Sequence, residues 1–284
     1  MTSGVVLLVK PPGCSSHDVV GAVRRRLGVP CGHLGTLDPL AAGLLVVAAG
    51  QATRLVRYAE GQDKSYVAEI WFGLATASED FAQPAVATAD AAWLSEGDVR
   101  AALAAEGAEA LQVPPAYSAR QVDGERAYRA ARHGRALDLP ARPAAIREAT
   151  ILSFAGGARA QVRLALRVSA GYYVRALARD LGRRLGLPAV LAALLRTGSG
   201  AFLLDQAQPL EEEPVLWPAQ ALVAHLPQVS LDAQAARRLS FGQRLPGAEG
   251  REGRWAVYHA ERLVAIVQAR QGVYHPETVL AMEE

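Results

Sequence analysis

The sequence predicts an α/β protein of the α+β kind, with a mixed, largely antiparallel sheet and a small C-terminal β-barrel. Strand and helix patterns are interspersed through residues 1–225. Beyond residue 226, short apolar runs alternate with turn residues, which is typical of a small all-β unit. We therefore expect two domains, residues 1–225 and 226–284.

The N-terminal third predicts two strands and two helices. An apolar run at residues 4–9 ends in Lys-Pro-Pro-Gly, which indicates a strand and a turn. Ser15 or Ser16 can cap a helix that runs to about residue 27 and ends in three arginines, which suit the negative end of a helix. A loop with Asp38, a strand at 44–48 and a short helix near 52–59 follow.

The middle of the chain predicts further strands and helices. Residues 64–72 are rich in β-formers, and residues 162–168 alternate apolar and polar side chains, so both segments predict strands. Ser95 and Asp98 resemble a capping box, with Asp in place of the usual Glu or Gln. We expect other helices at 126–134, 172–185 and 187–196, a linker at 206–218, and C-terminal strands at 229–231, 255–258 and 263–267.

Composition narrows the class of protein. The chain has 284 residues, of which 51% are hydrophobic, and this is enough for a substantial core. We find no run of about 18 apolar residues and no secretion signal, so we expect neither a membrane span nor export. Two unpatterned cysteines fit a reducing, cytoplasmic setting. The sequence contains neither a dinucleotide nor a P-loop fingerprint, and no His/Cys spacing typical of a metal site.

Charge is unevenly distributed along the chain. The net charge is only +2, yet residues 120–147 hold seven arginines against three acids. Such a segment can form a basic face for nucleic acid, or it can be an ordinary solvated helix surface. The chain has 28 arginines and only two lysines, Lys10 and Lys64, and both lie in its N-terminal part.

Residues 32–45 form the most unusual stretch, because a nearly apolar string holds a single carboxylate, Asp38. Pro39 pushes the backbone of Asp38 towards an extended or turn conformation. Apolar neighbours would desolvate the carboxylate, which is costly unless the group is paired or functional. From spacing alone, two readings stay open: Asp38 caps a turn beside a buried strand, or it is a catalytic group.

This stretch resembles the catalytic motif of the TruB family of tRNA pseudouridine synthases, which modify uridine 55 in the T loop. The resemblance runs from about residue 4 to residue 202 and includes four further motifs in the same order: Lys10-Pro11-Pro12-Gly13, Lys64-Ser65-Tyr66, Pro114-Pro115-Ala116-Tyr117-Ser118-Ala119 and Gly171-Tyr172-Tyr173-Val174-Arg175. It implies a pseudouridine synthase domain at 1–225, and the C-terminal unit resembles a PUA domain that binds RNA. The implied activity is an isomerisation that needs no cofactor and no metal.

The resemblance also implies roles for individual residues. Asp38 would be the nucleophile, Arg175 its counter-charge, and Tyr66 the ring that stacks on a flipped base. The residues implied in substrate binding are His33, which takes part in base flipping, Lys64, Asp80, which orients other groups, Tyr173 and Leu194. The expected partner is the T arm of tRNA, and we expect a monomer.

Three positions depart from the family pattern: Gln121, Ala170 and Leu195. They affect expected phosphate contacts and leave the proposed chemistry intact. Three alternatives remain. A glycosidase-like hydrolase would need paired carboxylates around the bond. A tRNA-binding or folding protein would not need Asp38, Tyr66 and Arg175 together. A guide-RNA-dependent relative would be expected to carry extensions for protein partners.

Overall fold

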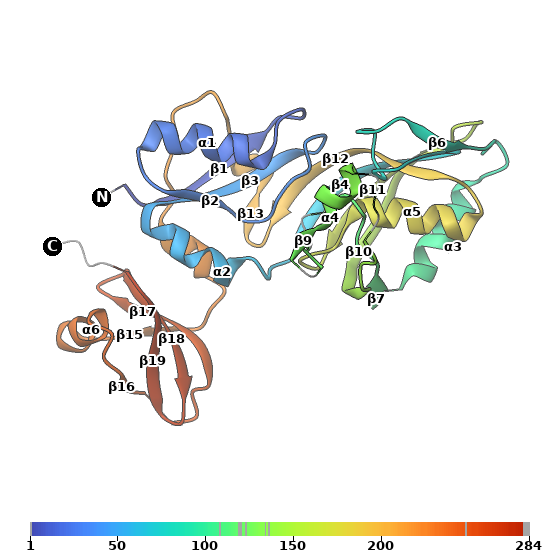
Figure 1. The fold of residues 1–284 in the computed structure, drawn as a ribbon. Coiled ribbons are helices and arrows are strands. Elements are labelled where there is room, and N and C mark those ends of the chain that lie inside the picture. Colours follow the sequence, from blue (N-terminus) through green and yellow to red (C-terminus); the bar gives the residue numbers. More distant parts are fainter. Residues whose placement is uncertain are drawn as a thin grey trace.

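One long mixed sheet organises most of the chain (Figure 1). The computed structural model describes residues 2–107, 109–118, 121–122, 124–133, 135, 137–247 and 249–280. The sheet has ten strands, and its main path runs β14-β1-β3-β12-β4-β11-β10-β7. Two of its pairs, β1 with β14 and β3 with β12, are parallel, and the others are antiparallel. The predicted fold class, mixed and largely antiparallel, is confirmed.

The first half of the sheet consists of β1 (Gly4–Lys10), β2 (Cys31–His33) and β3 (Ala42–Ala49), with α1 (Ser16–Leu27) packed on it. Ser15 and Asp18 form a reciprocal capping box at the start of α1, and Gly28 ends the helix in the left-handed conformation. After β3 the chain turns through η1 (Gly50–Leu55) and α2 (Val56–Ala59), where the sequence predicts a short helix.

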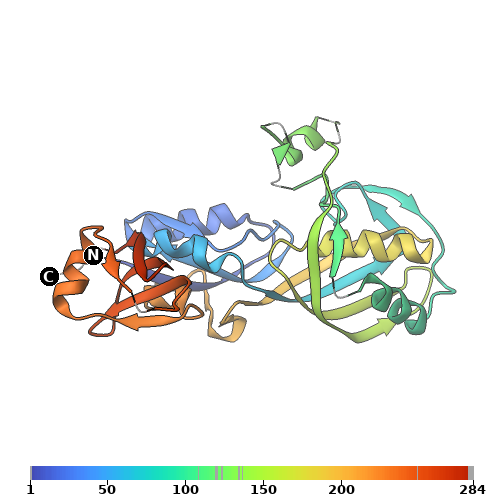
Figure 2. The ribbon, with the colours of Figure 1, turned by 90° about the horizontal axis from the view of Figure 1, so that it is seen from below.

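The second half of the sheet contains β4 (Lys64–Phe72), β7 (Glu109–Gln112), β10 (Arg142–Ala155), β11 (Gln161–Val168) and β12 (Ala189–Ser199). Apolar side chains of β4, β10, β11 and β12 pack in one core with α3 (Glu96–Glu106) and α5 (Val174–Leu185). The hairpin β5 (Leu74–Thr76) and β6 (Ala85–Thr88) lies outside the main sheet. Figure 2 shows β8 (Gln121–Val122), β9 (Glu125–Arg126) and α4 (Ala127–Arg132) projecting away from the sheet. Of the helix expected at 126–134, Gly134 lies outside the described residues.

Two predictions for the segment after residue 186 are wrong. The helix expected at residues 187–196 is β12, which joins the two halves of the sheet between β3 and β4. Its alanines and leucines favour a helix locally, but hydrogen bonding to two neighbouring strands outweighs that weak preference. The linker expected at 206–218 belongs to the sheet, because β14 (Gln208–Pro209) pairs with β1 and Trp217 exchanges backbone hydrogen bonds with Val5. The short elements β13 (Phe202–Leu203), η2 (Leu204–Gln206) and η3 (Ala219–Val223) complete this region.

The C-terminal part is a five-stranded sheet in the order β15-β17-β18-β19-β16. Its strands are β15 (Gln228–Ser230), β16 (Leu245–Pro246), β17 (Gly253–His259), β18 (Arg262–Arg270) and β19 (Val273–Val279). The three predicted strands correspond to β15, β17 and β18, whereas α6 (Ala233–Ser240) was not predicted. Closure of the sheet into a barrel stays a prediction.

The C-terminal sheet packs against the helical segments η1, α2 and η3 that border the first half of the long sheet, and shares one apolar cluster with them. Leu263 and Ile266 of β18 belong to the same apolar cluster as Val5 and Leu55. At the edge of this contact, the Tyr58 hydroxyl lies 2.8 Å from the hydroxyl oxygen of Thr278. The two predicted domains therefore share buried apolar surface, and the boundary at residue 226 stays a prediction. No helix in the described part of the chain is long and apolar enough to cross a bilayer.

Candidate active site

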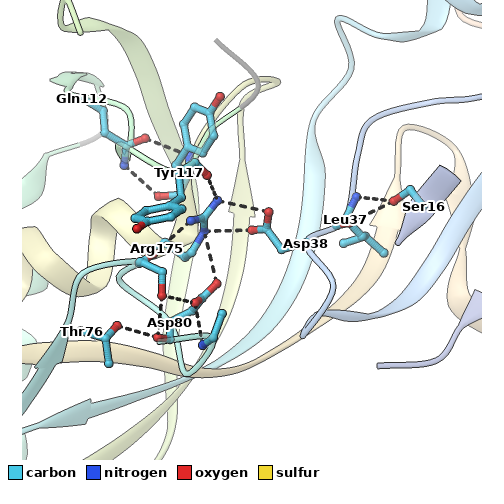
Figure 3. A network of polar contacts seen from close by, with 11 residues as sticks. Ser16, Leu37, Asp38, Thr76, Asp80, Gln112, Tyr117 and Arg175 are labelled. Carbon is cyan, nitrogen blue, oxygen red and sulfur yellow. Dashed lines mark hydrogen bonds and ion pairs between the residues drawn. The ribbon is translucent and has the colours of Figure 1, made fainter. Parts of the chain in front are cut away.

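Asp38 lies on a short loop between β2 and β3 that other elements hold in place (Figure 3). The Ser16 hydroxyl on α1 donates to the carbonyl of Leu37 at 3.0 Å and accepts from the N–H of Leu37 at 2.8 Å. On the other side, the Lys10 ammonium donates to the carbonyls of Cys14 (2.7 Å) and Pro39 (3.3 Å). The loop is thus fixed at both residues that flank Asp38, which leaves the carboxylate free to face the second half of the sheet.

Arg175, in the first turn of α5, meets Asp38 at two points (Figure 3). Its Nε lies 2.9 Å from Asp38 Oδ2, an ion-pair contact without hydrogen-bond geometry, and its Nη2 donates a hydrogen bond to Oδ1 at 3.1 Å. The Arg175 side chain is only 5% exposed, whereas the Asp38 side chain is 37% exposed. A two-point pair of this kind orients a carboxylate as well as neutralising it. The counter-charge that the sequence suggested for Asp38 is therefore in contact with it.

The two Nη atoms of Arg175 also donate hydrogen bonds to backbone carbonyls of two other segments. Nη1 donates to the carbonyl of Ser78 at 3.0 Å, and Nη2 also donates to the carbonyl of Tyr117 at 2.9 Å. These carbonyls were not predicted as part of the site, because a backbone acceptor leaves no signal in the sequence. Together with Asp38 they determine the plane of the guanidinium, so its orientation does not depend on one partner alone.

Asp80 supplies a second carboxylate beside the same guanidinium. Its Oδ2 lies 3.8 Å from Arg175 Nε. Its Oδ1 accepts from the Ser78 hydroxyl at 2.6 Å and from the backbone N–H of Ala82 at 3.0 Å. Asp80 is 7% exposed and is held by its own loop. This geometry suits a group that orients Arg175 and does not itself react.

Burial raises the pKa of the Asp38 carboxyl above its usual value, and the Arg175 guanidinium opposes that rise. The neighbouring Asp80 carboxylate raises the pKa of Asp38 further. A carboxylate of raised pKa is a stronger base, and an ion pair keeps it charged. The site therefore offers an oriented, partly exposed carboxylate that can act as a nucleophile.

Tyr66, on β4, lies opposite Arg196 of β12 in the sheet. Burial raises the pKa of the Tyr66 hydroxyl, and the hydrogen bond to Arg196 opposes the rise. Arg196 is 1% exposed, and it donates through Nε to the carbonyl of Leu44 at 2.7 Å and through both Nη atoms to the carbonyl of Gly35 at 3.2 Å. Arg196 thus ties Tyr66 to the start of the Asp38 loop, a role that the sequence analysis missed. The sequence does contain an indication of this role: Arg196 is a lone arginine in an apolar run, and a buried charge needs partners.

His33 and Lys64 lie at the base of the same loop. His33 is in β2, and burial lowers the pKa of its imidazole, so the ring is neutral at pH 7. Its Nδ1 is buried without a hydrogen-bond partner among the described residues. Lys64 begins β4, is 7% exposed and donates to the carbonyl of Gln62 at 2.6 Å. Burial, with help from the nearby Arg196, lowers the pKa of Lys64 to about 8.

Tyr173 and Leu194 border two different pockets. Tyr173 precedes α5 and lines a pocket of about 290 Å³ together with Gln112, Arg142 and Ala170. Leu194 lines a pocket of about 10 Å³ that also contains Asp38 and Asp80. That volume is about the size of one water molecule.

Two of the three departures from the family pattern can be placed, and neither contacts the Asp38–Arg175 pair. Ala170 lines the larger pocket, and Leu195 pairs with Ala42 in the sheet. The side chain of Gln121 lies outside the described part of the structure. Within the described residues, no three His, Cys, Asp or Glu side chains gather as metal ligands.

Comparison with known proteins gives one family. The family profile described as "TruB family pseudouridylate synthase (N terminal domain)" matches residues 24–174. A protein named tRNA pseudouridine synthase B from Symbiobacterium thermophilum is 46% identical over 244 residues, which are 84% of this chain and 82% of that protein. Another of the same name from Carboxydothermus hydrogenoformans is 39% identical over 286 residues, 99% of each chain.

Solved structures agree with this assignment. A Cbf5-Nop10-Gar1 complex contains a chain with a TM-score of 0.74 and 25% identity, covering 97% of this chain and 84% of that one. An H/ACA RNP bound to a substrate RNA also has a TM-score of 0.74, over 98% of this chain and 85% of that one, and at 23% identity it supports the fold alone. The family profile matches more than half of the chain, and the relatives align with most of it. The chain therefore belongs to the TruB family of pseudouridylate synthases.

Proposed function

We propose that this protein isomerises uridine to pseudouridine at position 55 in the T loop of tRNA, with Asp38 as the nucleophile. The observation that carries the proposal is the two-point pairing of Arg175 with a partly exposed Asp38, at 2.9 and 3.1 Å. The relatives named tRNA pseudouridine synthase B support tRNA as the substrate. The protein is then an isomerase.

The reaction breaks the glycosidic C–N bond, turns the base and forms a C–C bond. Atoms and electrons balance within the nucleotide, so no oxidant, reductant or water is consumed. The Asp38 carboxylate adds covalently to the substrate and is released when the new bond is complete. The proton on C5 of uracil leaves and the ring nitrogen N1 gains one, so the site must hold and orient the base and move one proton between these two positions of the ring.

The other residues of the site support this step. Arg175 keeps Asp38 ionised and oriented, and the Asp80 carboxylate, 3.8 Å from the same Nε, helps to orient the Arg175 guanidinium. Tyr66 provides a ring for the extruded base to stack on. His33, in its neutral form, assists base flipping, while Lys64, Tyr173 and Leu194 contact the substrate.

Recognition of the whole tRNA involves the rest of the molecule. We expect residues 1–225 to bind the T arm by its shape and residues 226–284 to act as a PUA-like RNA-binding domain. The expected working form is a cytoplasmic monomer. These assignments rest on the family resemblance and on the packing of the C-terminal sheet beside the first half of the long sheet.

Chemical mapping of pseudouridine tests the proposal. Purified protein is incubated with an unmodified tRNA transcript, and modified positions are read by sequencing. We expect one new pseudouridine, at position 55. Release of free uracil would indicate a glycosidase, and tRNA binding without modification would indicate a binding or folding protein. Either result would refute the proposal.

A further inference from the structure

Gln112 makes an unusual contact with the backbone of the active-site helix. Its side-chain Oε1 accepts from the backbone N–H of Tyr173 at 2.8 Å, and its Nε2 donates to the carbonyl of the same residue at 3.0 Å. Figure 3 shows this pair of bonds beside Arg175. Gln112 ends β7, is 7% exposed and lies 61 residues away in sequence. A buried amide thus bonds to both backbone polar groups of one distant residue.

The contact matters because of where Tyr173 lies in the chain. Tyr173 is the N-cap residue of α5, and its own side chain makes no capping hydrogen bond. Helix starts usually satisfy their free N–H groups with a local side chain, as Ser15 and Asp18 do for α1. For α5, the N-cap N–H is instead satisfied by Gln112, from the edge of the sheet. Arg175 follows Tyr173 by two residues, so the contact lies at the base of the guanidinium that pairs with Asp38.

The same segment touches α5 at a second point. Five residues after Gln112, the carbonyl of Tyr117 accepts from Arg175 Nη2 at 2.9 Å. One contact holds the backbone where α5 begins, and the other holds the end of the arginine side chain. The segment between them contains the Pro114-Pro115 pair, which restricts its backbone. Segment 112–117 therefore acts as a rigid brace on the start of α5.

From this arrangement we propose that Gln112 is a positioning residue for catalysis: its side-chain amide sets the start of α5, and so the aim of Arg175 at Asp38. The proposal rests on the proposed isomerase function. Gln112 acts through Arg175, so its loss changes how well the bound nucleotide is converted and leaves RNA binding largely intact. The expected signature is a fall in kcat with little change in KM.

A matched control exists at the opposite end of the same sheet. Gln208, in β14, also spans a backbone segment with its amide: Nε2 donates to the carbonyl of Glu213 at 2.7 Å, and Oε1 accepts from the N–H of Val215 at 2.8 Å. The sheet order places β14 and β7 at its two ends. Gln208→Met therefore removes the same kind of bonds as Gln112→Met, but far from Asp38.

The test compares Gln112→Met, Gln112→Glu and Gln208→Met with the wild type. Thermal unfolding reports the stability of each variant, and turnover of an unmodified tRNA transcript gives kcat and KM. We expect Gln112→Met to lower kcat by about tenfold or more, with KM within about threefold. Gln208→Met should keep kcat within about twofold, whatever its loss of stability. Gln112→Glu retains the acceptor for the Tyr173 N–H but turns a second acceptor towards the Tyr173 carbonyl, so its kcat should also fall, by about threefold or more, with KM within about threefold.

Three results would overturn the inference: an unchanged kcat in Gln112→Met, an equal loss of kcat in Gln208→Met, or a change confined to KM. An unchanged kcat in Gln112→Glu would also refute it, and this variant decides the matter should Gln112→Met not fold. The wild type in the same assay separates the two proposals. An inactive wild type refutes the isomerase function, whereas an active wild type with an equally active Gln112→Met refutes only the role of Gln112.

Discussion

Replacing Arg175 with lysine tests whether the two-point pair with Asp38 is needed for catalysis. Lysine keeps the positive charge but has one nitrogen in place of a planar fork. It cannot reproduce the contacts of Nε and Nη2 with both oxygens of Asp38 while also reaching the carbonyls of Ser78 and Tyr117. The substitution therefore keeps the charge and removes the geometry.

The size of the effect follows from the lost contacts. A hydrogen bond to a charged group contributes about 1.5–3 kcal/mol. Arg175→Lys loses at least one of the two Asp38 contacts and at least one carbonyl contact, and the site is shielded from water on the arginine side, where exposure is 5%. A loss of about 3 kcal/mol in transition-state stabilisation corresponds to roughly a hundredfold fall in kcat.

Arg183→Lys is the matched control on the same helix. The Arg183 side chain is 70% exposed and makes one ion pair, at 3.4 Å, with Asp180. Exposed pairs of this kind contribute little, so we expect kcat within about twofold of wild type. Single-turnover conversion of tRNA, measured with excess enzyme, gives the comparison for both variants. Similar rates for Arg175→Lys and Arg183→Lys would refute the pairing argument.

Three further predictions concern the rest of the molecule. Lys64 has a pKa of about 8 in the folded protein against 10.5 normally, so between these pH values the unfolded chain binds more protons and stability rises with pH. Urea unfolding should show wild type gaining up to about 3 kcal/mol over Lys64→Met from pH 8 to 10.5, and a constant difference would contradict this. Exhaustive chelation should leave conversion of an isolated T-arm stem-loop unchanged, and a strict need for a divalent ion would be inconsistent with the proposed chemistry. Removing residues 226–284 uncovers the apolar cluster around Tyr58, so calorimetry should show a lower melting temperature, while the stem-loop is still converted below it. Loss of stem-loop conversion in the folded truncated protein would place the C-terminal sheet in the active site.

Much of the local structure follows from sequence patterns that act over a few residues. The capping boxes at Ser15 and Ser95 and the alternation in β11 depend only on neighbouring side chains, and the structure has all three. By contrast, β12 is a strand because β3 and β4 pair with it on either side. Nothing local in its alanines and leucines records that pairing, and local preference pointed to a helix.

The same distinction applies to the site. The family resemblance singled out Asp38 and Arg175, and the structure brings them together across 137 residues. It could not indicate the carbonyls of Ser78 and Tyr117 or the amide of Gln112, because these groups matter only through where the fold places them. Arg196 could have been recognised, since a single arginine within an apolar strand requires buried partners.

The most direct test of Asp38 as the nucleophile is the activity of Asp38→Asn on unmodified tRNA. The amide has nearly the shape of the carboxylate, so folding and tRNA binding should be preserved, while the nucleophile is lost. Mapping of pseudouridine over long single-turnover incubations should show wild-type protein modifying position 55 and the variant at least about a thousandfold slower. Conversion by Asp38→Asn within about tenfold of the wild-type rate would show that Asp38 is not the nucleophile, and would contradict the account.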